Sequence, residues 1–265
     1  MKLFVCPNSR TKEQQKTAAF CMEKLEARTG AVCSLSREKS ELIFGNADLC
    51  RFEPEDADII VAIGGDGAVL RASHRAVAAN KPLLGINGGR LGFLCAYQPS
   101  ELDLLSRDFA EKLVSSERTL LEYDFDGKSG YALNDIIVAK STVGATVQMK
   151  LSVNGEEITE LLGDGVVIST PTGSTAYGYS SGGPVLSPFL CGIAITPVCP
   201  HGGIRPVVIP DDREITVKII RASGDGACIC ADGNDVGFSQ GEINIRKYAK
   251  KLTLLTKKSF VSEIK

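Results

Sequence analysis

The sequence predicts an α/β domain followed by a β-rich domain. In the N-terminal part, short apolar runs alternate with helix-forming segments, which is typical of a parallel sheet with helices on its faces. From about Leu120 onward, short strands follow one another, and Asn154-Gly155 after an alternating apolar and polar run is a strong hairpin signal. A length of 265 residues is long for one domain and sufficient for two.

Local patterns define the N-terminal elements. Thr11 and Gln14 can form a capping box, and Gly30 can end the helix that begins there. The run 59–63 is apolar and mostly β-branched, which indicates a strand buried on both faces. The expected strands are 2–6, 31–35, 58–63 and 82–86, and the expected helices lie between Thr11 and Gly30, at 40–49 and at 68–79.

A glycine turn, Gly64-Gly65-Asp66-Gly67, joins the buried strand to the next helix. Such a turn directs backbone N–H groups and a helix N-terminus at its ligand, which is usually a phosphate. Asp66 can take a proton from a substrate hydroxyl or orient it, and the alternative is a structural turn with an Asp cap. The loop 87–92 also follows a strand, so both loops are expected at one rim of the sheet.

The C-terminal half is predicted to be all-β. Its expected strands are 147–153, 166–169, 207–209, 215–219, 227–230 and 243–245. The segment 101–113 is expected to be the helix that leads into this half. A strand at 252–255 and a short amphipathic tail with Phe260, Val261 and Ile264 are expected at the end.

Composition excludes several classes of function. A formal net charge of −2 gives no reason to expect nucleic acid or an anionic membrane. No apolar run has the length of a membrane span, and the N-terminus lacks the features of a signal peptide, so a cytoplasmic protein is expected.

Cysteine and histidine usage predicts no metal site. The nine cysteines contain no C-x-x-C, and neither of the two histidines has a metal-ligand neighbour at i+4. Cys228 and Cys230 would share one face of a strand, where two buried thiols are the preferred interpretation over a metal pair.

Three further motifs carry chemistry. Asn134-Asp135 heads an apolar strand, where the amide can pair with a purine edge and the carboxylate can accept from a ribose diol, although a lone pair of this kind is more often a turn. Seven serine and threonine residues lie from Ser169 to Ser181, and four glycines lie from Gly173 to Gly183, which indicates a loop ordered by a ligand or a flexible linker. The interleaved Tyr177 and Tyr179 argue against a linker. Asp232-Gly233-Asn234 alone is only a turn.

Together these stretches resemble the NAD kinase family. The resemblance spans roughly residues 58 to 235 in the order of the family motifs: G-G-D-G at 64–67, N-x-G-x-L-G-F-L at Asn87–Leu94, Asn134-Asp135, G-D-G-x-x-x-S-T-P-T-G-S-T-A-Y at 163–177, and D-G-N at 232–234. The stretch S-T-P-T-G-S-T-A-Y is highly specific and is complete from Ser169 to Tyr177.

The resemblance implies a fold and a domain plan. It implies a Rossmann-like parallel α/β domain at residues 1–97 that carries G-G-D-G, and a β-sandwich-like, NAD-binding domain at residues 98–249. Residues 250–265 are expected to return to the first domain. This arrangement is the NAD kinase/diacylglycerol kinase-like fold.

The resemblance also implies an activity and partners. The expected reaction is transfer of the ATP γ-phosphoryl group, or that of polyphosphate in some members, to the 2′-hydroxyl of the adenosine ribose of NAD, with Mg²⁺ or another divalent cation. A homodimer or homotetramer is expected, and no nucleic acid or membrane partner. Phosphoryl transfer asks a protein mainly for positioning and charge neutralisation.

The resemblance assigns site residues, but no metal-ligating residue. Asp66 matches the catalytic base, and the phosphate-binding glycines are Gly64, Gly65 and Gly67. The expected NAD-binding residues are Asp66, Gly67, Arg71, Asn134, Asp135, Asp164, Thr175, Ala176, Tyr177, Ser180 and Asn234.

Three departures and two alternatives accompany this assignment. Leu162 stands where many members have a basic residue, Asn234 replaces a Gln, and the stretch 200–206 is one residue tighter than usual. A lipid or other small-alcohol kinase shares G-G-D-G but does not explain the stretch 169–180. A non-catalytic dinucleotide-binding module would be expected to lack Asp66.

Overall fold

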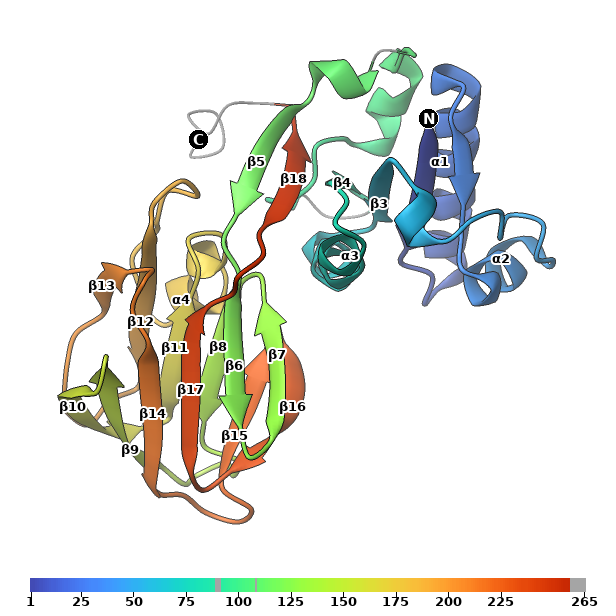
Figure 1. Cartoon of the computed structure of the whole chain (residues 1–265). Coiled ribbons are helices and arrows are strands. Elements are labelled where there is room, and N and C mark those ends of the chain that lie inside the picture. Colours follow the sequence, from blue (N-terminus) through green and yellow to red (C-terminus); the bar gives the residue numbers. More distant parts are fainter. Residues whose placement is uncertain (89–91, 108, 258–265) are drawn as a thin grey trace. The chain divides into compact units, whose positions relative to one another are not determined.

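The computed structural model describes residues 1–88, 92–107 and 109–257 (Figure 1). Contacts divide the chain into two units, of which the first comprises Met1–Glu117 with the segment from Leu252 onward and the second Arg118–Lys251. The division therefore falls later in the chain than the expected boundary after residue 97. Three positions of the motif 87–94, residues 89–91, and the tail residues Phe260, Val261 and Ile264 lie outside the described residues.

The first unit is built on a six-stranded sheet in the order β2-β1-β3-β4-β18-β5. The pairs β1–β2, β1–β3, β3–β4 and β4–β18 are parallel. Its elements are β1 (Lys2–Pro7), α1 (Lys12–Thr29), β2 (Val32–Ser34), α2 (Arg37–Phe44), η1 (Pro54–Asp56), β3 (Ile59–Ile63), α3 (Asp66–Ala79), β4 (Leu83–Ile86), η2 (Pro99–Leu104), η3 (Phe109–Lys112), β5 (Val114–Arg118) and β18 (Leu252–Thr256). The expected parallel α/β fold is confirmed.

Local chemistry explains the helix boundaries of this unit. The Thr11 hydroxyl accepts from the backbone N–H of Gln14, and the Gln14 side chain accepts in return, so the expected capping box is confirmed. Gly30 ends α1 in the left-handed conformation with φ 68°, which glycine adopts without steric penalty. Every residue of β3 is buried, as expected for a central parallel strand.

The expected helix at 101–113 is wrong. The chain forms two short 3₁₀ turns instead, η2 and η3. Leu102, Leu105 and Phe109 are all buried in the apolar cluster of the first unit. A 3₁₀ turn aligns side chains at i and i+3, so Leu102 and Leu105 enter the core together. Tertiary packing therefore overrides the helical propensity of this segment.

The second unit contains two six-stranded antiparallel sheets, in the orders β10-β9-β14-β17-β6-β7 and β13-β12-β11-β8-β15-β16. Its elements are β6 (Leu121–Phe125), β7 (Lys128–Ala132), β8 (Asp135–Ala139), β9 (Val147–Val153), β10 (Glu156–Gly163), β11 (Gly165–Ser169), η4 (Gly173–Thr175), α4 (Tyr177–Ser180), β12 (Gly192–Val198), β13 (Val207–Pro210), β14 (Ile215–Arg221), β15 (Ala227–Ala231), β16 (Asn234–Ser239) and β17 (Glu242–Lys247).

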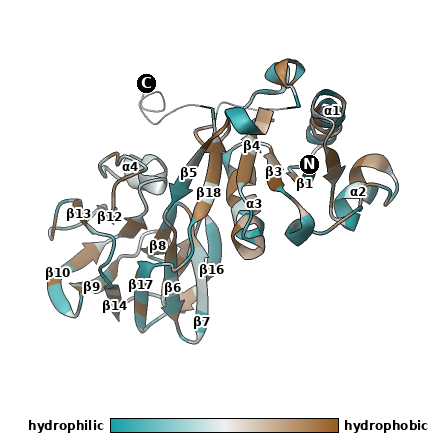
Figure 2. Ribbon diagram, turned by 45° about the horizontal axis from the view of Figure 1, so that its top comes forward, coloured by the Kyte–Doolittle hydropathy of each residue, from teal (hydrophilic) through white to brown (hydrophobic). Residues whose placement is uncertain are grey.

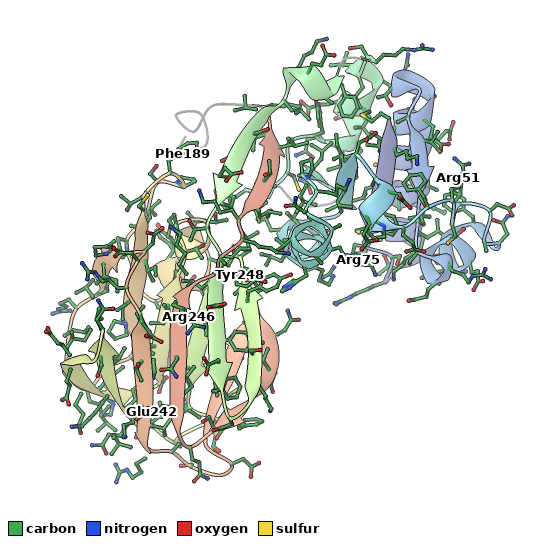
Figure 3. The ribbon with its side chains drawn as sticks, in the orientation of Figure 1. Arg51, Arg75, Phe189, Glu242, Arg246 and Tyr248 are labelled. Carbon is green, nitrogen blue, oxygen red and sulfur yellow. The ribbon has the colours of Figure 1, made fainter. Side chains whose placement is uncertain are left out.

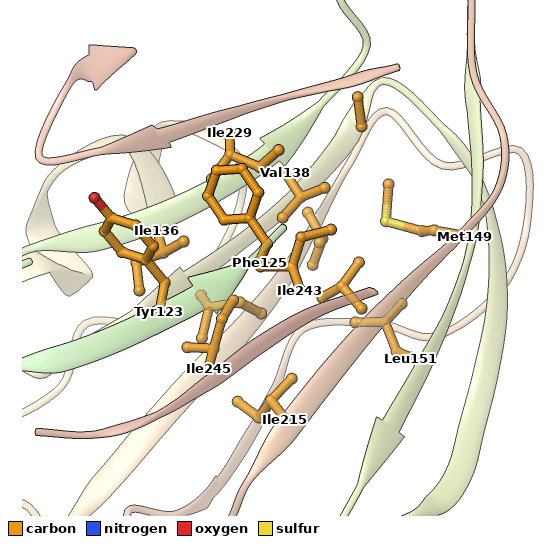
Figure 4. Packing of buried hydrophobic residues seen from close by; sticks show 14 of the residues in the cluster. Tyr123, Phe125, Ile136, Val138, Met149, Leu151, Ile215, Ile229, Ile243 and Ile245 are labelled. Carbon is orange, nitrogen blue, oxygen red and sulfur yellow. The ribbon is translucent and has the colours of Figure 1, made fainter. Parts of the chain in front are cut away.

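The core of the second unit lies between its two sheets. Figure 4 shows Tyr123, Phe125, Met149 and Ile243 of one sheet packed against residues of the other, such as Val138. Alternate residues of each strand enter this core and leave the intervening residues on the outer face. The expected β-sandwich is confirmed, and so is the hairpin of β9 and β10 at Asn154-Gly155.

Strand β18 brings a late segment of the chain into the first unit. It pairs in parallel with β4, with Leu254 opposite Leu83 and Leu255 opposite Leu84. Its apolar residues are brown in Figure 2, and three of its last four residues are buried. Lys257 continues the attachment, since its ammonium lies 2.8 Å from Glu101. Among the described residues, no helix combines the length and apolar composition needed to cross a bilayer.

Candidate active site

The glycine turn in the first unit is sterically required. Gly64 has φ 149°, and a Cβ there would lie 2.7 Å from the Cβ of Ala68 and 3.0 Å from that of Asn8. Gly65 is the N-cap of α3, and Gly67 is exposed in its first turn. The first N–H groups of a helix have no intrahelical partner and carry the positive end of its dipole. The turn therefore presents an anion-binding surface beside Asp66.

Asp66 is the first residue of α3 and is fixed by a loop that follows β4. Its Oδ2 accepts from the backbone N–H of Phe93 and its Oδ1 from that of Leu94, both at 3.0 Å. A Cβ on Gly92 would collide with the same carboxylate, so the loop approaches it closely only because that residue is glycine. A carboxylate has about four lone-pair sites, so Asp66 keeps acceptor capacity for a substrate hydroxyl.

A basic hollow of about 460 Å³ adjoins this turn within the first unit. Its lining combines the end of β1, one face of α3 and part of α2. The four cationic side chains that line it are Arg10, Lys39, Arg71 and Arg75. None of the described residues that line it is acidic. Asn8 links it to a smaller hollow of about 210 Å³ over Gly64 and Gly65.

The cations of the basic hollow differ in their existing partners. Partial burial lowers the pKa of Arg71, and the charge of Arg10 lowers it further. Lys39 donates to the Ser9 hydroxyl and lies 3.6 Å from the exposed carboxylate of Glu38. Arg75, labelled in Figure 3, lies over the Phe4 ring at 5.7 Å. Arg10 and Arg71 are therefore a crowded pair of like charges that an anion would stabilise.

Asn134 and Asp135 lie at the start of β8 in the second unit. The backbone carbonyl of Asn134 accepts from the Thr170 N–H at 2.9 Å, and a Cβ on Gly173 would collide with it. Among the described residues, the Asn134 side-chain oxygen is buried without a hydrogen-bond partner. A buried acceptor of this kind is favourable only when a donor reaches it. This atom is therefore suited to a ligand N–H group.

Asp135 is a buried carboxylate with 4% of its surface exposed. Burial, and after it the charge of Asp232, raise its pKa to about 7, although a hydrogen bond from the backbone N–H of Tyr177 opposes the rise. The group therefore changes charge close to neutral pH. It can accept from a ligand hydroxyl when ionised and donate to a ligand acceptor when protonated.

The hydroxyl-rich loop is a folded segment. Ser174 accepts from the Leu186 N–H and donates to the Pro171 carbonyl, which closes the loop on itself. Thr175, Tyr177 and Ser180 are exposed, and Ala176 is half-buried. Because the N–H of Tyr177 reaches Asp135, the structure brings the loop and the Asn134-Asp135 pair together. A flexible linker is excluded.

Asp164 is separated from that group. It precedes β11, whose first residue, Gly165, pairs with Ala139, whereas its last residue, Ser169, pairs with Asp135. A strand of five residues spans about 16 Å, so Asp164 and Asp135 lie at opposite ends of β11. The Asp164 carboxylate instead pairs with the Lys140 ammonium at 2.7 Å. The sequence pattern gave no sign of Lys140.

Two departures from the family pattern have clear positions. The Asn234 amide donates to the Ala231 and Asp232 carbonyls at 3.4 Å, so its side chain is directed at the local turn. Leu162 is half-buried on β10 opposite Gln148, next to the buried Leu161. Neighbouring residues of a strand face opposite sides, so Leu162 points away from the core of the sandwich.

Sequence reasoning missed several polar side chains at these sites. Arg10 follows the first strand, and Arg75 lies one helical turn beyond Arg71, so both positions could have been read from the spacing. Asp232 and Lys140 act through contacts with distant segments that no local pattern reveals.

Comparisons with known proteins agree with this arrangement. Residues 2–113 match the family model of the ATP-NAD kinase N-terminal domain, and residues 133–255 match that of the C-terminal domain. An NAD kinase of Bacteroides fragilis is 38% identical over 232 residues, covering 83% of this chain and 80% of that protein. One of Wolinella succinogenes is 35% identical over 214 residues, covering 77% of this chain and 72% of that protein.

Solved structures give the same result. An NAD kinase from Archaeoglobus fulgidus in complex with ATP has a TM-score of 0.71 and 27% identity, covering 97% of this chain and 92% of that one. A yeast NADH kinase complexed with NADH shares the fold, with a TM-score of 0.84 and 22% identity over 100% of this chain and 86% of that one. The two family-model matches and the relatives similar over most of their length show that this chain belongs to the NAD kinase family.

Proposed function

We propose that this chain transfers the γ-phosphoryl group of ATP to the 2′-hydroxyl of the adenosine ribose of NAD. The observation that carries the proposal is a carboxylate, Asp66, at an anion-binding turn beside a hollow that four cations line, with no acidic side chain among the described lining residues. Phosphoryl transfer depends on positioning and on charge neutralisation, and this arrangement supplies both. The assignment is supported by the similarity to the Bacteroides fragilis NAD kinase and to the Archaeoglobus fulgidus NAD kinase that was solved in complex with ATP.

The donor assignment rests on the first unit. The glycine turn of Gly64, Gly65 and Gly67 would bind the terminal phosphate through backbone N–H groups. Arg71 and Arg10 would bind the rest of the phosphate chain, because an anion relieves the repulsion between them. Asp66 would accept the proton that leaves the 2′-hydroxyl as the new P–O bond forms, and ADP would leave with the bridging oxygen.

The acceptor assignment rests on the second unit. The side-chain oxygen of Asn134, which has no partner in the described part of the chain, would accept from the amino group of a purine, and Asp135 would accept from ribose hydroxyls. Exposed Thr175, Tyr177 and Ser180 and half-buried Ala176 would extend this surface. Asp164 would contact a different part of the dinucleotide from Asp135, since they lie at opposite ends of β11. Asn234 would contribute mainly by shaping the turn beside Asp232.

A divalent cation such as Mg²⁺ fits this chain as an ion that binds together with the nucleotide phosphates. Within the described residues, no group of three or more His, Cys, Asp or Glu side chains is placed to hold an ion alone. Magnesium is commonly held by one or two carboxylates together with substrate phosphates, and Asp66 is the carboxylate at the turn. The ion would supply charge neutralisation on the phosphates. We further propose a homo-oligomer in the cytoplasm.

One assay tests the proposed function. Purified protein is incubated with ATP, Mg²⁺ and NAD, and NADP is measured with an NADP-specific dehydrogenase. NADP formation that requires all three components supports the proposal. A folded, nucleotide-binding protein that forms no NADP, or that phosphorylates a lipid or another alcohol instead, would contradict it.

A further inference from the structure

Asp232 reaches across the second unit to hold the backbone ahead of β8. It follows β15 in the left-handed conformation with φ 50°. Its Oδ2 accepts from the Leu133 N–H at 2.8 Å and its Oδ1 from the Asn134 N–H at 2.7 Å. Each carboxylate oxygen therefore has a backbone donor from a segment almost a hundred residues earlier. Such charge-assisted bonds are stronger than neutral ones and fix the geometry of both partners.

The same backbone is held from its other side by Thr170. The Thr170 hydroxyl donates to the Leu133 carbonyl at 2.6 Å, and its N–H donates to the Asn134 carbonyl. The two peptide units are thus bound through both their N–H and their C=O groups. This explains how the Asn134 side-chain oxygen stays buried without a partner among the described residues, ready for a ligand.

Asp232 also acts on the neighbouring carboxylate. Its backbone N–H donates to the Asp135 carbonyl at 3.1 Å, so the two acidic residues lie side by side. The titratable groups that face Asp135 are Asp232 from the turn after β15 and the Cys230 thiol from β15 itself. The Tyr177 N–H faces it from α4, and Ser169 is its partner on β11. None of these described groups carries a positive charge.

An ionised Asp135 is therefore opposed by burial and by a like charge, and none of the described groups that face it is a cation. Burial and Asp232 together account for the rise of its pKa to about 7. Two carboxylates in one site raise the pKa of the less solvated member, which here is Asp135. Asp232 is already committed to two N–H donors, which stabilise its charged form.

We propose that Asp232 is a positioning residue that presents Asn134 to the adenosine end of NAD and sets the protonation state of Asp135, so that NAD affinity depends on pH near neutrality. The proposal rests on NAD as the ligand of this surface. Ionised Asp135 can accept hydrogen bonds from two ribose hydroxyls, one at each oxygen. In the protonated group one oxygen carries the proton and becomes a donor, so fewer hydroxyls can be bound. NAD affinity then rises with pH, and KM for NAD falls about tenfold between pH 6 and pH 8 for a group with a pKa near 7.

The test compares Asp232→Asn with wild type. The substitution removes the charge while the burial remains, so the pKa of Asp135 falls and KM for NAD changes less between pH 6 and pH 8 than in wild type. Asp235→Asn is the matched control, because Asp235 is an exposed carboxylate on β16 that accepts from the Gly237 N–H, whereas the carboxylate that accepts from the Leu133 and Asn134 N–H groups is that of Asp232. Its pH dependence should equal that of wild type. An unchanged pH dependence in Asp232→Asn would overturn the proposal.

A second measurement needs neither NAD nor turnover. Carbon-13 NMR of the Asp carboxyl groups in the unliganded protein follows the titration of Asp135, with Asp135→Asn identifying its resonance. Wild type should titrate near pH 7, and Asp232→Asn at a lower pH if it remains folded. A wild-type midpoint near pH 4 overturns the proposal whether or not the variant folds. Failure of NAD to bind, with the expected NMR titration, would instead contradict the proposed function.

Discussion

Asp66→Asn separates a chemical role of this residue from its structural role, which is to bind the loop through the Phe93 and Leu94 N–H groups. The carboxylate accepts two backbone N–H groups, from Phe93 and Leu94, and it occupies the first position of α3. Asparagine keeps one acceptor oxygen but directs an NH₂ group at the other N–H donor. It also removes a negative charge from a helix N-terminus, an interaction of about 0.3–1 kcal/mol.

The structural part of the effect has a defined size. Loss of one hydrogen bond to a charged acceptor lowers the free energy of unfolding by about 1–3 kcal/mol. Phe93 lies in an exposed loop, where water can replace the lost bond. We therefore expect a decrease in the free energy of unfolding of about 1–3 kcal/mol and a Tm lower by roughly 2–8 °C. If Asp66 also accepts the proton of the 2′-hydroxyl, kcat should fall by about 10²- to 10⁴-fold with little change in NAD affinity.

Gly92→Ala is the matched control for the structural role of Asp66. Its new Cβ would collide with the Asp66 carboxylate and displace the loop, while the carboxylate itself remains. The assay is steady-state NADP formation with Tm measured on the same samples. Asp66→Asn should lose far more activity than Gly92→Ala at an equal loss of Tm. Near wild-type turnover of Asp66→Asn, or equal losses in both variants, would refute the catalytic role.

Other substitutions address the remaining side chains. Asn134→Ala should raise KM for NAD much more than KM for ATP, because it removes a buried acceptor in the second unit; equal effects on both substrates would return Asn134 to a structural role. Arg71→Met should raise KM for ATP and flatten its dependence on salt, since a cation of the basic hollow is lost; an unchanged salt slope contradicts this. Leu162→Arg should shift stability by less than about 0.5 kcal/mol and leave the salt dependence of KM for NAD unchanged, because Leu162 faces away from the core; a steeper slope would place it near the dinucleotide. The unliganded protein should lose stability between pH 4 and pH 7, because the folded-state pKa of Asp135 is raised to about 7. The stabilisation from this raised pKa is complete below the unfolded-state pKa and is lost as pH rises through the folded-state pKa. Denaturation of Asp135→Asn should lack this loss, and an identical loss in the variant would contradict the prediction.

Local sequence rules predicted the elements that local contacts determine. The apolar run of β3, the glycine turn and the helix after it are confirmed, as are the capping box of Thr11 and the hairpin at Asn154-Gly155. Each of these depends on residues within a few positions of one another. The two 3₁₀ turns at 99–112 were not predicted, because burial of Leu102 and Leu105 decided the backbone there.

The site shows the same division between local and distant contacts. Motifs identified Asp66 and the Asn134-Asp135 pair. The structure adds the two backbone N–H groups that bind the Asp66 carboxylate, and a buried Asn134 oxygen that has no partner among the residues that the structure describes. The role of Asp232 depends on hydrogen bonds to residues almost a hundred positions away, which no periodicity encodes. The pairing of Lys140 with Asp164 likewise follows from the register of β8 and β11.

The fate of the γ-phosphoryl group of ATP shows whether the protein transfers this group to NAD. The protein is incubated with NAD, Mg²⁺ and ATP labelled with phosphorus-32 at the γ position, and the dinucleotide product is separated from ADP. We expect one labelled phosphate per NADP formed, attached to the 2′-oxygen of the adenosine ribose, which phosphorus-31 NMR of the product identifies. Label that is released as inorganic phosphate, or that is attached to any other hydroxyl, would contradict it.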